Sequence, residues 1–111
     1  MRREKTTLLQ GTLDLIVLQL LAAEPTNGYD LTLRIQAISK NVLNVNAGSV
    51  YPALYRLEEH GWIRARWMDT EKGRRAKVYS LTASGQKQRA VERETWQRFS
   101  GALAAILRTT G

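Results

Sequence analysis

Tyr51, Tyr55 and Arg56 are the residues whose chemistry is most informative, because all three fall within one predicted helix. Two phenolic hydroxyls and a guanidinium can bind phosphate oxygens or the edges of bases. The apolar residues of the same segment recur at helical spacing and are predicted to face a core: Val50, Leu54 and Leu57. The three polar side chains fall on other faces, which favours contact with DNA. Half-buried tyrosines that merely cover the core are the alternative.

The beginning of this helix also suits DNA binding. A helix that enters the major groove by its N-terminal end needs small residues there, and Gly48 and Ser49 provide them. Free N–H groups at a helix start bind phosphate favourably. Pro52 limits where the helix can start, because proline lacks an N–H and clashes deep inside a helix. We therefore predict Ser49 as the N-cap; an N-cap at Asn46 would distort the first turn.

A basic loop follows the predicted DNA-reading helix. Residues 62–68 and 77–81 are strand-like, and the polar connection at 69–76 contains Gly73, so a hairpin is predicted. Between residues 64 and 77, positive side chains outnumber negative ones by six to two. Four of them are predicted to bind DNA: Lys72, Arg74, Arg75 and Lys77. The guanidinium groups of Arg74 and Arg75 at the hairpin tip can lie along a narrow minor groove or its phosphates. A solvated hairpin is the alternative, and the position directly after the helix favours DNA.

The C-terminal segment is predicted to be one long helix, capped by Thr82 and ending near Arg108. Its apolar residues recur at helical spacing and form a seam that needs a partner: Val91, Trp96, Phe99, Leu103 and Ile106. The first helix, predicted at about residues 11–23, offers a second apolar face with Leu9, Leu13 and Ile16. We expect these two helices to form a homodimer, whose two-fold symmetry matches a palindromic operator. Folding back onto the first helix of the same chain is the alternative.

Trp96 and Phe99 are also candidates for an effector site between subunits. Trp96 would then provide an aromatic wall for a small aromatic compound. An ordinary interface anchor is the simpler interpretation of the same residue.

The order of predicted elements is helix, helix, helix, strand, strand, helix. The second helix is predicted to follow a turn at residues 26–28, with Asn27 as its N-cap. This order predicts a mainly α fold with a small β-hairpin, namely a winged helix-turn-helix at residues 1–82 and a dimerisation helix at 83–111.

Composition agrees with a nucleic-acid partner. The 111 residues carry a formal net charge of +7, as expected of a polyanion binder. The absence of cysteine excludes disulfides and thiolate metal sites and indicates a reducing cytoplasm. Polar residues interrupt the apolar stretch at residues 8–23, so neither a signal peptide nor a membrane span is predicted. A single histidine, His60, and no paired carboxylates predict no metal, cofactor or enzymatic activity.

Four motifs resemble the PadR family of bacterial transcriptional regulators. They are GTLDLIVLQLLA (11–22), NGYDL (27–31), GSVYPALYRLEEHGWI (48–63) and GRRAKVYSLTASG (73–85). The resemblance covers roughly residues 8–90, and Tyr51-Pro52 is its most specific element. The short C-terminus resembles the compact subgroup that has a single dimerisation helix.

This resemblance implies a homodimeric winged-helix repressor joined through the first and last helices. It implies that Tyr51 contacts a phosphate, and that the hairpin around Arg74 and Arg75 touches the minor groove. Some relatives bind flat aromatic compounds beside an aromatic residue of the last helix, and Trp96 is suitably placed. A nonspecific architectural DNA binder and a protein-interaction adaptor remain the alternative functions.

Overall fold

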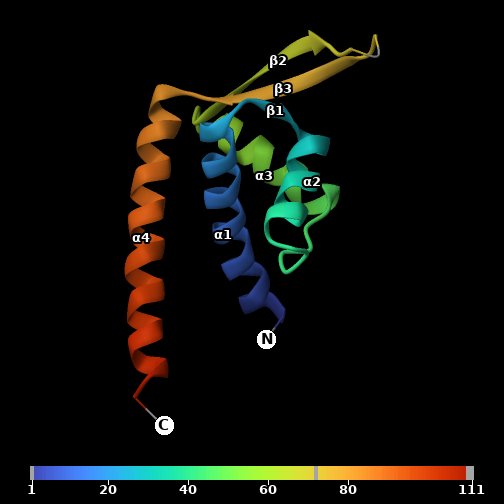
Figure 1. Ribbon diagram of the computed structural model, residues 1–111. Helices are drawn as coiled ribbons and strands as arrows, with labels where there is room; N and C mark the ends of the chain where they lie inside the picture. The colour runs from blue at the N-terminus through green and yellow to red at the C-terminus, as the bar shows by residue number, and fades with distance from the viewer. Residues whose placement is uncertain (1, 72, 110–111) are drawn as a thin grey trace.

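The computed structural model describes the backbone of residues 2–71 and 73–109, and the side chains from residue 11 onward within these ranges. Its elements are α1 (Arg2–Ala23), β1 (Thr26–Asn27), α2 (Gly28–Ile38), α3 (Ala47–Glu59), β2 (Ile63–Asp69), β3 (Arg75–Leu81) and α4 (Ala83–Leu107). Helices α1, α2 and α3 cluster beneath a small sheet, and α4 stands beside α1 (Figure 1). The winged helix-turn-helix prediction is confirmed.

The first helix extends further than its sequence pattern predicted. It begins at Arg2 rather than near Gly11. The four residues after Met1 include arginine, glutamate and lysine, which favour helices, and one internal glycine costs only about 1 kcal/mol. None of the described helices is long and apolar enough to cross a membrane.

The sheet is antiparallel, with strand order β1-β3-β2. β2 and β3 form the wing hairpin, in register from Ile63 opposite Leu81 to Asp69 opposite Arg75. Its loop closes through a 2.7 Å bond from the Thr70 amide to the Arg74 carbonyl. β1, which the sequence predicted as part of a turn, pairs Thr26 with Tyr79. Two residues show no alternation, so only the pairing with β3 reveals this strand.

The core is formed by apolar side chains from the three clustered helices and the sheet. It contains Leu13, Val17, Leu18, Leu21, Leu31, Ile35, Val45, Val50, Ala53, Leu54, Leu57, Ile63 and Tyr79. The sheet contributes Tyr79, whose ring is 1% exposed, and burial raises the pKa of its hydroxyl. The hairpin is thus held to the helices by Tyr79 of β3 and Ile63 of β2.

The start of α3 differs from the predicted one. Asn46, not Ser49, is the N-cap, and the two residues form a reciprocal capping box. The Ser49 amide donates to Asn46 Oδ1 at 3.2 Å, and the Asn46 amide donates to Ser49 Oγ at 3.4 Å. Pro52 therefore lies inside the helix. The prediction of Ser49 was wrong: the capping box at Asn46 forms even though Pro52, inside the helix, has no N–H for a helical bond.

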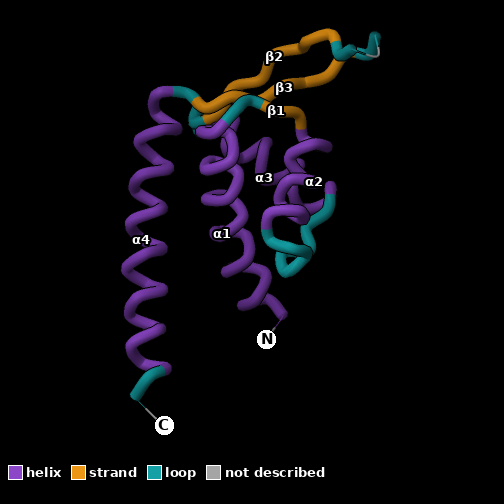
Figure 2. The backbone as a smooth tube through the Cα atoms, in the orientation of Figure 1, coloured by secondary structure: helices purple, strands orange, loops and turns teal. Residues whose placement is uncertain are grey.

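Helix α4 is anchored to the turn between α3 and β2. Thr82 is its N-cap, as predicted, and accepts from the Gly85 amide at 3.0 Å. The Thr82 hydroxyl donates to the Gly61 carbonyl at 2.6 Å. Gly85 packs so closely on the Trp62 carbonyl that a Cβ there would overlap it. Below this anchor α4 runs alongside α1 and continues past it (Figure 2).

Candidate nucleic-acid interface and subunit surface

Helix α3 buries one face and exposes its first turn. Val50, Ala53, Leu54 and Leu57 are fully buried against the core. Gly48 is exposed at the tip and Ser49 is half-buried. The capping box uses the Ser49 amide, so within the described part of this turn the amides of Ala47 and Gly48 remain to receive an acceptor from outside. The tip offers backbone donors to an anion.

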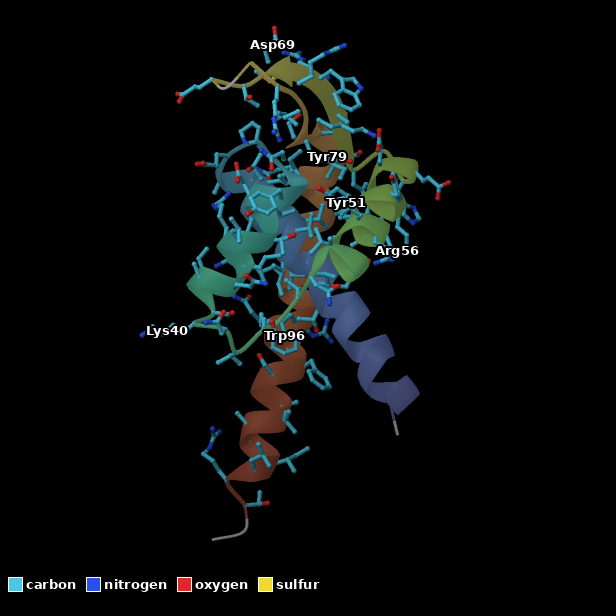
Figure 3. All side chains as sticks on the ribbon, turned by 90° about the vertical axis from the view of Figure 1, so that its right-hand side faces the viewer. Lys40, Tyr51, Arg56, Asp69, Tyr79 and Trp96 are labelled. Carbon is cyan, nitrogen blue, oxygen red and sulfur yellow. The ribbon has the colours of Figure 1, made fainter. Side chains whose placement is uncertain are left out.

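Tyr51 joins the N-terminal ends of α2 and α3. Its half-buried ring lies over Gly28, the first residue of α2. Tyr51 is labelled in Figure 3. A Cβ on Gly28 would come within 2.6 Å of the ring carbons Cε1 and Cζ and 2.7 Å of the hydroxyl oxygen. A side chain at position 28 would therefore require the Tyr51 ring to move. The contact between Tyr51 and Gly28 is not visible in the sequence, because the two residues are far apart in the chain.

Tyr55 and Lys77, both predicted to bind DNA, lie together between α3 and the wing. Tyr55 is 58% exposed, and the Lys77 ammonium nitrogen lies 5.9 Å from its ring centroid. The same nitrogen lies 5.6 Å from the Tyr79 ring and 3.9 Å from the Glu58 carboxylate. Lys77 thereby links the wing to α3.

Arg56 faces α1 rather than the tip of α3. Its Nη2 donates to Asp14 Oδ1 at 2.6 Å, forming a partly buried ion pair. Burial raises the pKa of Asp14 above its ordinary value, although the guanidinium and its hydrogen bond act in the opposite direction. The geometry assigns Arg56 a contact that holds α3 to α1, and sequence spacing gave no sign of Asp14 as its partner.

The described part of the wing tip presents cationic side chains to solvent. Arg74 and Arg75 are exposed, and the Arg74 amide donates to Thr70 Oγ1 at 3.2 Å. The Arg75 guanidinium carbon lies 5.6 Å from the ring centroid of Trp67. Lys72, also predicted to contact DNA, lies outside the described residues.

The apolar seam of α4 is uncovered within the chain. Five of its side chains are between 44% and 64% exposed: Val91, Trp96, Phe99, Leu103 and Ile106. The rings of Trp96 and Phe99 lie with their centroids 5.8 Å apart. Folding back onto α1, the alternative considered above, therefore does not bury this seam.

The three predicted interface residues of α1 have different environments. Leu13 is 3% exposed and belongs to the core of its own chain, while Ile16 is partly buried. The side chain of Leu9 lies outside the described part of the structure.

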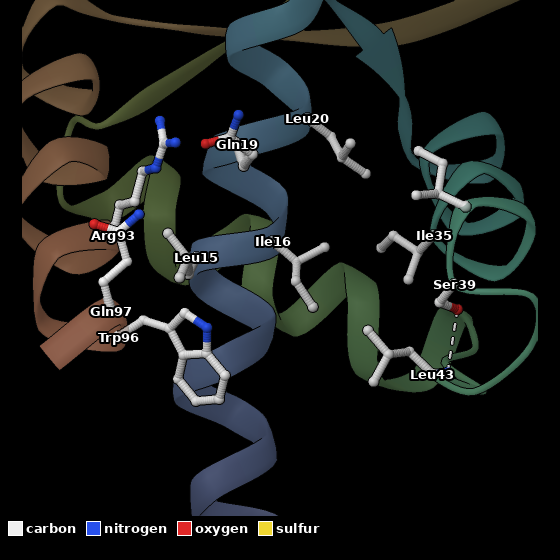
Figure 4. A pocket seen from close by; sticks show the side chains of 11 residues that line it. Leu15, Ile16, Gln19, Leu20, Ile35, Ser39, Leu43, Arg93, Trp96 and Gln97 are labelled. Carbon is white, nitrogen blue, oxygen red and sulfur yellow. Dashed lines mark hydrogen bonds between the residues drawn. The ribbon is translucent and has the colours of Figure 1, made fainter. Parts of the chain in front are cut away.

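A mostly apolar pocket of about 470 Å³ lies between α1, α2 and α4 (Figure 4). It is lined by Leu15, Ile16, Gln19, Leu20, Ile35, Ile38, Ser39, Leu43, Arg93, Trp96 and Gln97. Trp96 projects from α4 toward α1 at one side of this space. The Arg89 guanidinium donates to Gln19 Oε1 at 3.0 Å and ties α4 to α1 beside it. Among the described residues, no group of histidine and acidic side chains could hold a metal ion.

Comparisons with known proteins agree with this architecture. Residues 17–91 match the transcriptional regulator PadR-like family. An uncharacterized protein of Lysinibacillus sphaericus is 27% identical over 81 residues, covering 73% of this chain and 74% of that protein. A transcriptional regulator from Clostridium thermocellum shares the fold with a TM-score of 0.83 at 24% identity, covering 92% of this chain and 99% of that one. For a Streptococcus transcriptional regulator the TM-score is 0.78 at 28% identity, with coverage of 91% and 97%.

The ion pair between α1 and α3 predicts a pH-dependent loss of stability when it is broken. Arg56→Met keeps the aliphatic packing but leaves the Asp14 carboxylate without its partner, and should cost about 1–2 kcal/mol at pH 7. Because burial raises the pKa of Asp14, the folded state binds a proton more readily than the unfolded state. Removing the guanidinium raises that pKa further, so the loss should shrink as pH falls toward it.

Urea unfolding at pH 7 and pH 5, at one protein concentration, measures this difference. In an Asp14→Asn background the same Arg56 change should cost less and should be equal at both pH values. A loss that is independent of pH with Asp14 present would contradict the role of its carboxylate.

Proposed function

Because the chain belongs to the PadR-like family of transcriptional regulators, we propose that it is a sequence-specific DNA-binding repressor that acts as a homodimer. The observation that carries this proposal is the division of its surface. The wing and the N-terminal ends of α2 and α3 lie on one side of the molecule, and the uncovered helix α4 lies on the other (Figure 1). One side suits DNA and the other suits a second subunit.

On the DNA side, the tip of α3 enters the major groove and the wing lies along the neighbouring backbone or minor groove. Gly48, Ser49, Tyr51 and Tyr55 form the α3 part of the proposed interface. Lys72, Arg74, Arg75 and Lys77 form its wing part. Arg56 is assigned to the ion pair with Asp14 instead, which sets the position of α3.

The wing contacts are tested by replacing Arg74 and Arg75 with alanine. The slope of log affinity against log salt concentration is negative, and each lost phosphate contact should make it shallower by roughly 0.9. Binding at physiological salt should weaken as well. Fluorescence anisotropy on DNA from just upstream of the protein's own gene provides the measurement, with scrambled duplex as competitor. Replacing Lys87 and Arg98 of α4 with alanine is the control, because it also lowers the net charge from +7 to +5. If both double variants change the affinity and its salt dependence equally, Arg74 and Arg75 do not contact DNA.

The same titration separates the candidate functions. A regulator prefers its operator over scrambled duplex by typically ~10³ or more, whereas an architectural protein binds both alike. Absence of binding to any duplex would favour a protein-interaction adaptor. The excess of positive side chains on the wing argues against the adaptor, whereas the architectural protein would share it and differs only in the specificity ratio.

On the opposite side, we propose that the α4 seams of two chains pack together and against α1. Burying large apolar side chains that are half-exposed in one chain is favourable at about 25 cal/mol per Å². A two-fold axis through this seam would place two reading helices on the successive half-sites of a palindromic operator.

Leu103→Glu tests the subunit interface, because it places a carboxylate in the middle of the seam. The parent should be a dimer and the variant largely monomeric in sedimentation equilibrium, since burying an unpaired charge is costly. Ala105→Glu introduces the same charge about 200° away around the helix and should leave the dimer intact. A monomeric parent, or dissociation by both variants, would overturn the proposed interface.

The pocket beside Trp96 supports a small aromatic effector as the signal for release. Its lining is mainly aliphatic, with Trp96 on one side and Arg93 nearby to meet an anionic group. Trp96 and Phe99 are the residues that we propose contact such a compound, because their rings lie at the seam.

Trp96→Leu should separate ligand binding from DNA binding. It preserves an apolar seam but removes the aromatic surface, so the affinity for anilinonaphthalene sulfonate, a flat aromatic probe, should fall roughly two- to tenfold. Operator affinity and dimerisation should fall less than the affinity for the probe, because leucine keeps the seam apolar. Identical probe titrations for variant and parent would remove Trp96 from the pocket's function.

A further inference from the structure

Trp67 is a large apolar residue that the core does not bury. It is 57% exposed although it lies on β2, the strand that begins with the fully buried Ile63. Side chains alternate along a strand, so Ile63, Ala65 and Trp67 project to one face. Trp67 therefore lies on the core-facing side of the wing but beyond the edge of the core.

Two cationic side chains share this face with Trp67. In an antiparallel pair, residues directly opposite project to the same side, which places Lys77 beside Trp67 and Arg75 beside Asp69. The Arg75 guanidinium carbon lies 5.6 Å from the Trp67 ring centroid. Lys77 is directed to Tyr55 of α3 and to Tyr79. The surface between wing and α3 thus carries Tyr55, Trp67, Arg75 and Lys77.

Arg75 differs from the other paired cations of the described structure. The two ion pairs among the described side chains join Arg56 to Asp14 and Lys77 to Glu58. Arg75 instead rests on the indole. The face of the Trp67 ring attracts the Arg75 guanidinium through the ring quadrupole, but it does not accept hydrogen bonds from the guanidinium N–H groups. These N–H groups therefore remain available to an acceptor with two oxygens.

We propose that Trp67 is a positioning residue, which holds the Arg75 guanidinium in place to bind a phosphate of the DNA backbone. The proposal rests on the DNA-binding function above and adds a residue and a mechanism to it. The rigid ring restricts the rotamers of Arg75 before DNA arrives, so less side-chain freedom is lost on binding. Most of the indole surface is exposed, so its replacement removes little packing within the protein.

A double-mutant cycle on operator affinity tests this role. Trp67→Leu should weaken DNA binding roughly two- to fivefold, the size of an exposed cation–π contact. The slope of log affinity against log salt concentration should become shallower and approach that of Arg75→Ala. Trp67→Tyr keeps a ring face and should retain most of the affinity. Met68→Leu is the matched control, because Met68 is 46% exposed and lies on the other face of the same strand. This variant should bind DNA with the affinity of the parent.

In an Arg75→Ala background, Trp67→Leu should have no further effect, because the residue it positions is gone. A full loss in that background would show that Trp67 contacts DNA directly and would overturn the positioning role. So would parental affinity and slope in Trp67→Leu itself. Because a phosphate contact is independent of DNA sequence, the same double-mutant cycle measured on scrambled duplex should give the same coupling. If the parent shows no preference for the operator, only the proposed regulator function is contradicted, and the role of Trp67 is not. A parent that binds no DNA overturns both.

Discussion

The position of the proposed DNA contacts on α3 depends on the burial of one face of that helix. Val50, Ala53, Leu54 and Leu57 are completely withdrawn from solvent, and this packing sets the axis of the helix. Its first turn then projects beyond the core, where a capping box satisfies the Ser49 amide and leaves the tip small and polar. A helix buried all round could not present this end, and a helix buried less would not hold it still.

Three contacts around that apolar face fix the rotation of α3. At the N-terminal end, Tyr51 packs on Gly28 of α2. At the other end, Arg56 bonds to Asp14 of α1, and Glu58 approaches Lys77 of the wing. Each contact joins α3 to a different element. Tyr51 and Lys77 therefore hold α3 in place and also belong to the proposed DNA interface, whereas Arg56 only holds the helix.

The turn after α3 gives the wing and α4 a shared anchor. His60 and Trp62, the sequence neighbours of Gly61, stack with their ring centroids 4.2 Å apart. Gly61 itself has a φ of +76°, which suits glycine. Thr82 and Ser84 both donate to the Gly61 carbonyl, and Gly85 packs on Trp62. The proposed dimer helix and the wing thus start from one rigid point, so the spacing of two wings in a dimer would follow the angle between the two copies of α4.

Local sequence was sufficient for the order of the four helices and the wing hairpin, the caps at Asn27 and Thr82, the end of α3 before Gly61 and the exposed seam of α4. These features depend on residues within one or two helical turns of one another, so spacing alone reveals them. The Asn46 cap was missed although it is local, because the capping box with Ser49 forms even with Pro52 inside the helix. Tertiary structure alone decided that residues 26–27 join the sheet and that Leu13 is buried in its own chain. It also decided the partners of Arg56, Tyr51 and Arg75 and the pocket beside Trp96. A residue type and its periodicity specify which face is apolar, but they do not specify which distant side chain that face meets, because such contacts arise only when separate elements pack together.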